Sequence, residues 1–536
     1  MSSESYSPKH MAPEPRQPQE RPSETVSQPT PEPEPQAAPR VSRPLALAFV
    51  GLCLVAMIVP LALTPLSSRG ASAENRTLAA MPALSTETGP NLEFLSQLGA
   101  WYADHFGLRS ELIDLDSSIK ESLFGTSSTD NVVVGSKGWL YYAGELNDWR
   151  QMTPLSERGV KNAARNLSLV QEVVRSQGKG FVVAIAPNKS SLYPEHMPAW
   201  QLAAKGESNA SRLAAELARQ GVNYVDLFGV LRAQNRELYL LKDSHWTNEG
   251  ALLAANALLD ALGHPHVDWL SEQPVSDSSL KGDLNAMLHP VTASGETQPL
   301  WQSAQAFSFE SEATNVEEAS LDTSSAAAGG LLMMRDSFGN ALLPYMASSY
   351  GHAHFSKLMP YDLGNAALSK ADDVVIVRAE RHLSSFATMP PYLAAPERTL
   401  AENLPTRDLV AEQGSSSGTV SVSKNGPYLQ VEGVLDPQLF AASADSHILV
   451  SLRAADGTMH TFEAFCVSTD SDAYADTEAQ ASSGGEESIL SLPDAEDYGY
   501  RAYVSLGTYA DWTPAHLSVL VADDVSVTTV VNVSLV

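Results

Sequence analysis

The chain has 536 residues, too many for one domain of ordinary size, and 43% of them are hydrophobic, enough to build real cores. A formal net charge of −29 argues against nucleic acid as a partner, because such a surface repels phosphate backbones. The two cysteines, Cys53 and Cys466, cannot make a disulfide framework, a zinc site or a redox motif. The sequence therefore gives no sign of a metal ion or an organic cofactor.

The N-terminal part is predicted to place the rest of the chain outside the cytoplasm. Residues 1–43 are rich in Pro, Glu, Gln and Ser, and we expect them to form a disordered cytoplasmic tail. The uncharged stretch 44–66 is long enough to cross a ~30 Å hydrocarbon core, which predicts a transmembrane anchor. Because Arg40 and Arg43 precede this stretch, the positive-inside rule keeps the N-terminus in the cytoplasm.

The anchor is expected to be retained rather than removed. Cleavage after the small-residue triplet at 71–73 is the alternative, but the leader is longer than that of an ordinary signal peptide. An exported chain without a disulfide indicates a bacterial envelope. We therefore predict a protein that crosses a bacterial cell membrane once.

Residues 67–400 alternate between helical and strand-like patterns, which predicts an α/β domain with a mostly parallel sheet. The apolar spacing predicts helices over Glu157–Ser176, 211–220, Glu249–Leu262 and Asn340–Tyr350. Short apolar runs predict strands over Phe181–Ala186, Asn223–Asp226, Leu238–Leu241, Leu331–Met334 and Val374–Val377. Ligands of such sheets bind at the carboxyl ends of the strands.

Three further segments complete the predicted organisation. Residues 291–330 are rich in Ser, Ala, Thr and Glu with little periodicity, and we expect a long surface insertion. Residues 401–418, with a Gly-Ser run, are expected to be a linker. Period-two patterns separated by turn signals over 419–536 predict an antiparallel β-sandwich.

A first polar segment follows the predicted strand Leu238–Leu241. In an extended chain, residues i and i+2 point the same way, so Asp243 can accept a hydrogen bond from one ring nitrogen of His245. That contact would fix the tautomer and leave the other nitrogen free to act as a base. The structural alternative is an Asp that caps the next helix and a His that only packs.

A second polar segment follows the apolar strand Leu331–Met334. Ser337 is expected near the N-terminus of the next helix, where free backbone N–H groups can hold a developing oxyanion. The alternative is that Asp336 or Ser337 is only a helix N-cap. Because both polar segments follow strands of one sheet, they can meet at the same edge, and this favours catalysis.

An ordered set of motifs over roughly residues 74–390 resembles the SGNH-hydrolase-like family of the AlgX and AlgJ type, which includes the DHHW proteins. The matching segments are Glu74–Arg76, Met81–Leu84, Trp101–Arg109, Val134–Tyr141, Ala186–Glu195, Asp243–Thr247, Gly282–Leu288, Arg335–Gly339 and Arg378–Leu383. The resemblance implies a three-layer SGNH-like domain. It also implies that Ser337 is the nucleophile, His245 the general base and Asp243 its orienting partner.

The donors of the oxyanion hole are left open by the resemblance. Candidates are the Ser337 N–H, Asn188 and Arg381, with Lys189 weaker. Arg335 stands where the family usually has Gly, and its side chain could crowd or line the pocket. Asn188 could instead cap a turn, and Arg381 could pair with a carboxylate.

The resemblance implies an O-acetyltransferase that acts on hydroxyls of a cell-surface or secreted polysaccharide through an acetyl-enzyme intermediate. Similar systems use a membrane-bound MBOAT-type acyltransferase as the acetyl donor. The C-terminal sandwich would then be a carbohydrate-binding module, in which Tyr428, Tyr500, Tyr503 and Trp512 could stack on sugars or serve as ordinary core and surface residues. Two alternatives are an acetyl esterase with the same site and a non-catalytic envelope protein that binds glycans.

Overall fold

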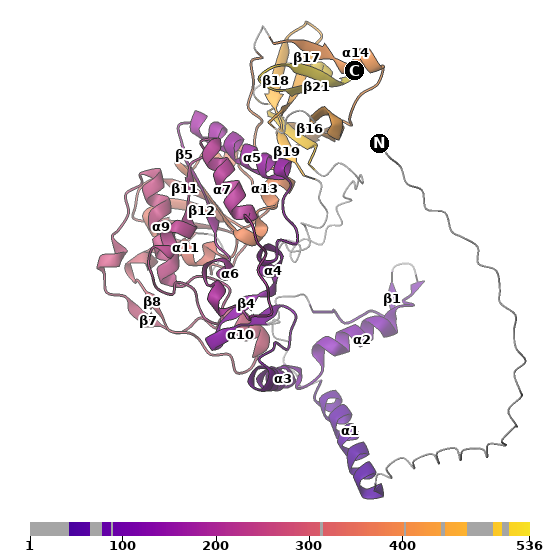
Figure 1. Ribbon diagram of the computed structural model, residues 1–536, viewed down its shortest axis with the longest axis vertical. Coiled ribbons are helices and arrows are strands. Elements are labelled where there is room, and N and C mark those ends of the chain that lie inside the picture. Colours follow the sequence, from indigo (N-terminus) through magenta and orange to yellow (C-terminus); the bar gives the residue numbers. More distant parts are fainter. Residues whose placement is uncertain are drawn as a thin grey trace, which may run out of the picture. The chain divides into compact units, whose positions relative to one another are not determined.

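The computed structural model describes residues 42–64, 78–86, 89–310, 315–400, 404–440, 445–468, 497–505, 507 and 514–535 (Figure 1). The predicted tail through residue 41, the small-residue triplet at 71–73 and Trp512 lie outside these residues. The chain divides into two compact units, residues 1–62 and 63–536, and each is described by itself.

Helix α1, Arg43–Leu63, covers most of the stretch predicted as a membrane anchor. Its most apolar window has a mean hydropathy of 2.7, and within the described residues it is the one helix long and apolar enough to cross a membrane. Leu, Val, Ala and Ile dominate its sequence on every side, as expected for a helix surrounded by lipid. The prediction of an apolar spanning segment is thus supported by length and composition.

A seven-stranded sheet forms the centre of the α/β domain, in the order β6-β5-β13-β11-β12-β10-β9. Five neighbouring strands run parallel: β6 (Tyr224–Val225), β5 (Gly180–Ala186), β13 (Asp373–Ala379), β11 (Gly330–Met334) and β12 (His352–Ser356). Strand β10 (Ser320–Ser325) is antiparallel to β12, and β9 (Phe307–Phe309) is antiparallel to β10. The mostly parallel α/β sheet predicted from the sequence is confirmed.

Helices cover both faces of this sheet because its strands are apolar on both sides. In β5, Val182 and Ala184 pack in one core cluster, and Val183 packs in the other. The first cluster also receives α8 (Leu227–Arg232), α9 (Asn248–Leu262) and α11 (Gly339–Ser349). The second receives α5 (Glu157–Ser176), α7 (Asn209–Arg219) and α13 (Ser385–Thr388). Figure 1 shows α9 and α11 on one side of the strands and α5 and α7 on the other.

Local sequence signals set the ends of these helices. The side chain of Ser156 accepts from Gly159 N at the start of α5, and that of Thr247 accepts from Gly250 N at the start of α9. Helix α9 ends at Gly263, whose φ of 67° lies in the left-handed region that glycine adopts without strain. The residues that follow Gly263, as far as 276, carry only short elements, among them η5 (Trp269–Ser271).

The predicted strand Leu238–Leu241 is wrong. This segment makes only an isolated bridge, between Tyr239 and Trp246. Its backbone folds back on the residues that follow: Thr247 N donates to Leu238 O (2.7 Å), and Leu240 N donates to His245 O (3.2 Å). Because these groups are used locally, the segment forms a tight turn instead of adding a strand to the sheet.

The expectation of a surface insertion over residues 291–330 is wrong, because β8 (Gln298–Leu300), β9 and β10 lie there and Trp301 and Ala304 are buried in the first core cluster. Strand β10 lies there, antiparallel to β12, with Leu321 and Thr323 buried on the same face. Strand β9 pairs with β10 and forms the edge of the sheet. Strand β12 was not predicted at all, because its two histidines interrupt the apolar pattern.

The C-terminal region is rich in β-strands arranged in two sheets. One has the order β14-β22-β21-β17-β18 and the other β15-β16-β20-β19. The strands are β14 (Thr406–Asp408), β15 (Ser421–Asn425), β16 (Tyr428–Val434), β17 (His447–Ala454), β18 (Met459–Glu463), β19 (Phe465–Val467), β20 (Gly499–Ser505), β21 (Pro514–Ala522) and β22 (Val527–Ser534). Both sheets contribute side chains to one core cluster, for example Val431 from β16 and Val450 from β17.

The segment predicted as a linker, 401–418, carries regular structure where it is described. Strand β14 pairs in parallel with β22, and helix α14 (Leu409–Gln413) follows it. The side chain of Leu409 is buried in the core of the C-terminal region. The sequence did not predict β14 and α14, because few apolar residues precede the Gly-Ser run.

Helix α5 of the α/β domain contacts the C-terminal region directly. The Asn166 side chain donates to Phe386 O (2.9 Å) and Cys466 O (2.8 Å) and accepts from Cys466 N (2.9 Å). Nearby, the buried carboxylate of Glu463 accepts hydrogen bonds from Arg165, Arg398 and His447. We call these four residues the Glu463 cluster.

Candidate active site

The structure brings Ser337, His245 and Asp243 into one hydrogen-bonded row. The Ser337 Oγ lies 2.9 Å from His245 Nε2, and His245 Nδ1 lies 2.8 Å from Asp243 Oδ1. A carboxylate on Nδ1 requires the proton there, which leaves the lone pair of Nε2 facing the serine hydroxyl. This geometry allows the imidazole to take the hydroxyl proton as the oxygen attacks an acyl carbon.

Ser337 lies in the short turn between β11 and α11, at the carboxyl edge of the sheet. Asp336 shapes this turn: its Oδ1 accepts from Phe338 N (3.0 Å), and its Oδ2 accepts from Ala379 N (2.6 Å) at the end of β13. The N-cap position of α11 belongs to Phe338, without a side-chain cap. Asp336 therefore ties two neighbouring strand ends together and does not cap the helix.

His245 reaches the serine from the turn that replaces the predicted strand. Trp246 Nε1 donates to Phe338 O (3.1 Å), and the rings of His245 and Phe338 have centroids 4.8 Å apart. Asp243 accepts further hydrogen bonds from His245 N (2.8 Å) and from the backbone N of Asp283 (2.9 Å). The turn and the serine segment are thus locked to each other by contacts on both sides of the imidazole.

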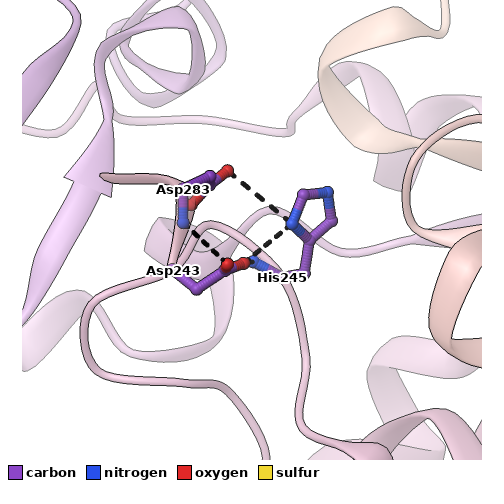
Figure 2. A group of neighbouring side chains, drawn as sticks. All are labelled: Asp243, His245 and Asp283. Carbon is purple, nitrogen blue, oxygen red and sulfur yellow. Dashed lines mark hydrogen bonds and ion pairs between the residues drawn. The ribbon is translucent and has the colours of Figure 1, made fainter. Parts of the chain in front are cut away.

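A second acid, Asp283, lies beside the pair (Figure 2). Its Oδ2 lies 3.7 Å from His245 Nδ1, against 2.8 Å for Asp243 Oδ1. Its carboxylate accepts hydrogen bonds from Ser244 N (2.8 Å) and from the Ser244 hydroxyl. The site therefore holds two carboxylates against one imidazole, although motif analysis assigned a role to only one of them.

The surrounding charges shift the pKa values of all three groups. Burial disfavours the imidazolium of His245, but the charge and hydrogen bond of Asp243 outweigh burial and raise its pKa to about 9. Burial opposes the charged form of Asp243 as well, yet His245 lowers the pKa of that carboxyl to about 2. Burial and the neighbouring Asp243 raise the pKa of Asp283 to about 6.

The candidate oxyanion donors differ in how they are held. Asn188 is fully buried after β5, where its backbone N donates to Glu380 Oε2 (2.9 Å) and its Nδ2 donates to Asp148 Oδ2 (2.9 Å). The guanidinium of Arg381 lies 5.4 Å from the ring centroids of Tyr142 and Phe338. The bond to Asp148 uses one N–H of the Asn188 amide, and the amide has a second N–H donor.

Arg335 and Lys189 are structural ties in this structure. The Arg335 guanidinium donates to Asn340 Oδ1 and to the carbonyls of Val316 (2.9 Å) and Glu318 (3.2 Å), at the segment that leads into β10. These contacts use the side chain to hold that segment in place. This structural role is an alternative to the predicted role, in which Arg335 crowds or lines the pocket.

Lys189 Nζ donates to the carbonyls of Leu140 (2.6 Å), Leu241 (2.8 Å) and Asp243 (2.9 Å). Its side chain is fully buried, and burial lowers its pKa to about 8 despite nearby acids. Lys189 thereby fixes the backbone of the turn that carries Asp243.

Asp243, His245 and Asp283 are also the described residues whose ligand atoms lie close enough, within 4.8 Å of one another, to hold a metal ion. Their oxygens already serve other groups, since Asp243 accepts from three N–H donors and Asp283 from Ser244 and Leu284 N. A cation would have to displace these donors. The carboxylate oxygens of the two acids therefore serve as acceptors for the imidazole and the backbone.

Sequence reasoning predicted roles for Ser337, His245 and Asp243, which the structure brings together, and assigned none to Asp283 and Ser244. Asp283 was noticed only as part of the motif Gly282–Leu288, and spacing alone could not bring it to His245. Gly282 was the available signal, because glycine allows the backbone to approach another chain segment closely.

Residues 132–333 match a family model described as the SGNH hydrolase-like domain of the acetyltransferase AlgX. This segment contains Asp243, His245 and Asp283, and Ser337 follows it by a few residues. The resemblance expected from the motifs is confirmed over this part of the chain.

Among similar proteins, the chain is 31% identical over 199 residues to a protein of Pseudomonas syringae pathovar tomato named "Probable alginate O-acetylase AlgJ". The match covers 35% of this chain and 48% of that protein, so the chain spans about half the length of this relative.

Two solved structures are also similar. PatB1 of Bacillus cereus has a TM-score of 0.37 at 14% identity and covers 48% of this chain and 96% of that chain. The O-acetyltransferase domain of Pseudomonas putida AlgJ has a TM-score of 0.31 at 17% identity and covers 47% and 92%.

Proposed function

We propose, from the premise that residues 132–333 form an AlgX-type SGNH hydrolase-like domain, that this protein is an O-acetyltransferase of a bacterial envelope polysaccharide. The observation that carries the proposal is the row in which Ser337 Oγ lies 2.9 Å from His245 Nε2 and His245 Nδ1 lies 2.8 Å from Asp243. The name of the similar protein, "Probable alginate O-acetylase AlgJ", supports acetyl as the acyl group.

The reaction consists of two acyl transfers. In the first, Ser337 Oγ attacks the acetyl carbonyl carbon while its proton moves to His245 Nε2, and the donor leaves with that proton. In the second, a sugar hydroxyl attacks the acetyl-serine, its proton moves to His245, and Ser337 recovers the proton as the ester of the sugar departs. Asp243 holds the imidazole and stabilises its charged form in both steps.

The location and partners belong to the proposal as well. Helix α1 supports a single membrane crossing, with the tail in the cytoplasm and the acyl-transfer domain outside. Acetyl groups outside the membrane need a carrier, and a membrane-bound MBOAT-type acyltransferase is the donor that the family resemblance implies. The acceptor is a polysaccharide hydroxyl.

A role of the C-terminal β-rich region in holding the glycan has less support. Tyr428, Tyr500 and Tyr503 are each at most 2% exposed, so these rings are core residues and do not offer a face to a sugar. A glycan would need another surface of the region. The proposal for this region is therefore binding by polar side chains rather than by these aromatic rings.

The test is turnover of 4-nitrophenyl acetate by the full-length protein in detergent, with and without an oligosaccharide acceptor. Wild type should release nitrophenol and form acetylated sugar, and Ser337→Ala should lose about 10³-fold or more of the rate. The matched control is Ser349→Ala, a buried serine of α11 whose hydroxyl only donates to Tyr345 O (2.8 Å).

Three outcomes are informative. Acetylated sugar that depends on Ser337 supports the transferase. Acetate alone, in the presence of acceptors of several compositions, would turn the conclusion to an esterase with the same site. Equal rates for wild type and Ser337→Ala would remove Ser337 as the nucleophile and leave a non-catalytic glycan-binding protein.

A further inference from the structure

The backbone at the start of α10 (Asp283–Leu288) contacts the turn that carries Asp243. Asn285 N donates to Lys242 O (3.0 Å), and Asp283 N donates to Asp243 Oδ2 (2.9 Å). A Cβ on Gly282 would lie 2.3 Å from Lys242 O, so only glycine allows this approach. The two segments are forty residues apart in the chain and are held in contact at the site.

The other face of α10 is anchored in a small core of its own. Leu284 and Leu288 are fully buried in a cluster with Val132 and Leu140, from the two-stranded sheet β3 (Val132–Val134) and β4 (Leu140–Tyr142). This anchorage fixes the position of the Asp283 side chain. Its carboxylate is therefore held near His245 by packing on one side and by Ser244 on the other.

Asp283 forms a clamp with Ser244. Its Oδ1 accepts from Ser244 N (2.8 Å) and its Oδ2 from the Ser244 hydroxyl, whose oxygen lies 3.2 Å from His245 Nδ1. The Oδ2 itself lies 3.7 Å from the same ring nitrogen. The Nδ1 proton of His245 thus points to Asp243, and the Ser244 hydroxyl and the Asp283 carboxylate lie farther from Nδ1.

We propose that Asp283 is a positioning residue of the acyl-transfer site, which clamps Ser244 and Asp243 around His245 and supplies a second negative charge that stabilises the imidazolium. The inference rests on the function proposed above. When Ser337 Oγ attacks, its proton moves to Nε2 and the ring becomes positive. Two carboxylates then face this charge, and the cost of forming it inside the protein is reduced.

The charges around the ring define what removal of this carboxylate should do. His245 faces Asp243 and Asp283, which favour its charged form, and Arg381, which opposes it. Lys189, on the far side of the turn, is close enough to both acids to be affected by their charge. Without the charge of Asp283, His245 should lose its proton at lower pH, and it should also be a weaker base.

The variant that isolates this charge is Asp283→Asn. The amide keeps an oxygen for Ser244 N and Leu284 N, so the start of α10 retains its acceptor. Ser244→Ala removes the hydroxyl but leaves the carboxylate. The matched control is Asp277→Asn, because Asp277 also accepts from the N (3.0 Å) and Oγ (3.0 Å) of one serine, Ser279, in an exposed turn.

The measurement is kcat/KM for 4-nitrophenyl acetate against pH, with the full-length protein in detergent. In parallel, the rate at which a fluorophosphonate probe labels Ser337 is followed by mass spectrometry. For Asp283→Asn we expect the rising limb of both profiles to move down by about one pH unit. The plateau rate should fall on the order of 10-fold. Asp283→Glu should restore the limb partly, and Asp277→Asn should match wild type.

A purely structural role would lower the melting temperature and the plateau but leave the limb where it is in wild type. That result, or profiles of Asp283→Asn that superimpose on wild type, would overturn the role of Asp283 while Ser337-dependent turnover stands. Absence of Ser337-dependent turnover and of probe labelling in wild type would instead overturn the proposed function, and this inference with it.

Discussion

Two clusters in the protein hold carboxylates against basic groups, and they differ in the ratio of acids to bases. At the candidate active site two acids, Asp243 and Asp283, face one imidazole. In the Glu463 cluster one acid, itself 3% exposed, faces Arg165, Arg398 and His447. The first arrangement has a surplus of negative charge, which keeps a proton on His245. In the second, three basic groups meet two acids, because Glu172 also pairs with Arg398, and the cluster binds two parts of the chain together.

The difference suggests how buried charge divides between chemistry and stability. The surplus of negative charge beside His245 stabilises the imidazolium that forms when the ring takes the Ser337 proton, and so lowers the barrier. A carboxylate already paired in the folded state contributes to folding and loses that contribution when its partners go. Substitutions at the two places should therefore affect different quantities, and this separation can be tested.

The largest effect is expected for Asp243→Asn. An amide at this position can present an N–H to His245 Nδ1, which favours the wrong tautomer and leaves Nε2 protonated toward Ser337. We expect kcat for acetyl-ester turnover to fall by about 10³–10⁴-fold. The melting temperature, followed by circular dichroism, should fall less than for the Glu463 variant below. A lowered melting temperature with wild-type specific activity would contradict this separation between activity and stability.

The next effect is expected for Glu463→Gln. This substitution removes the anion that Arg165 and Arg398 share, while Arg398 keeps its ion pair with Glu172. We expect the unfolding free energy to fall by about 3 kcal/mol, measured by urea denaturation. The specific activity of the folded fraction should stay that of wild type. Glu412→Gln, whose carboxylate is exposed beside Arg407, is the control and should leave stability nearly unchanged.

A smaller effect is expected from pH alone. Burial opposes the charged form of Glu463, but His447 and Arg165 outweigh it and lower its pKa to about 2. The folded pKa is below that of the unfolded chain, so the contribution of Glu463 is complete above pH 4.5 and is lost as pH falls toward 2. Acid titration of stability should show this loss in wild type and not in Glu463→Gln. Parallel curves for the two proteins would count against the cluster.

The smallest effect is expected for Tyr500→Phe. The Tyr500 hydroxyl donates to Thr419 O (2.9 Å) inside the C-terminal region, and its ring is buried. Loss of this hydrogen bond should cost about 1 kcal/mol of unfolding free energy. Retention of the protein on an immobilised polysaccharide should not change. Weaker retention without loss of stability would show that the ring contacts the glycan after all.

The sequence predicted the fold where apolar periodicity was long. Helix α5 and strand β5 begin and end within a residue of the predicted bounds, because their patterns are unbroken and their caps are clear. Strands β9 and β10 were missed, since alternating Ser, Asp and Thr in β10 bury only one face at the sheet edge. Residues 238–241 look like a strand but satisfy their backbone groups in a turn, which periodicity cannot distinguish.

The site was predictable to the extent that it lies on two short segments. Ser337 and the pair Asp243–His245 each follow recognisable patterns, but only Ser337 follows a strand of the sheet, and the turn that carries Asp243 and His245 reaches it through the contacts of His245 and Trp246 with Phe338. Asp283 comes from a third segment outside the sheet, whose position depends on the small core around Leu284 and Leu288. The hydrogen bonds of Arg335 and Asn188 depend on tertiary contacts with Val316 and Asp148, and no local pattern encodes those.

The contact of Asn166 with Cys466 has a consequence for how the protein behaves at high concentration. Strand β19 lies at the edge of its sheet, where unpaired backbone groups could recruit a strand from another molecule. The Asn166 amide satisfies both the N–H and the C=O of Cys466, in the manner of a one-residue β-bridge. Helix α5 thereby blocks an exposed edge, and the protein is guarded against self-assembly into fibres at this point.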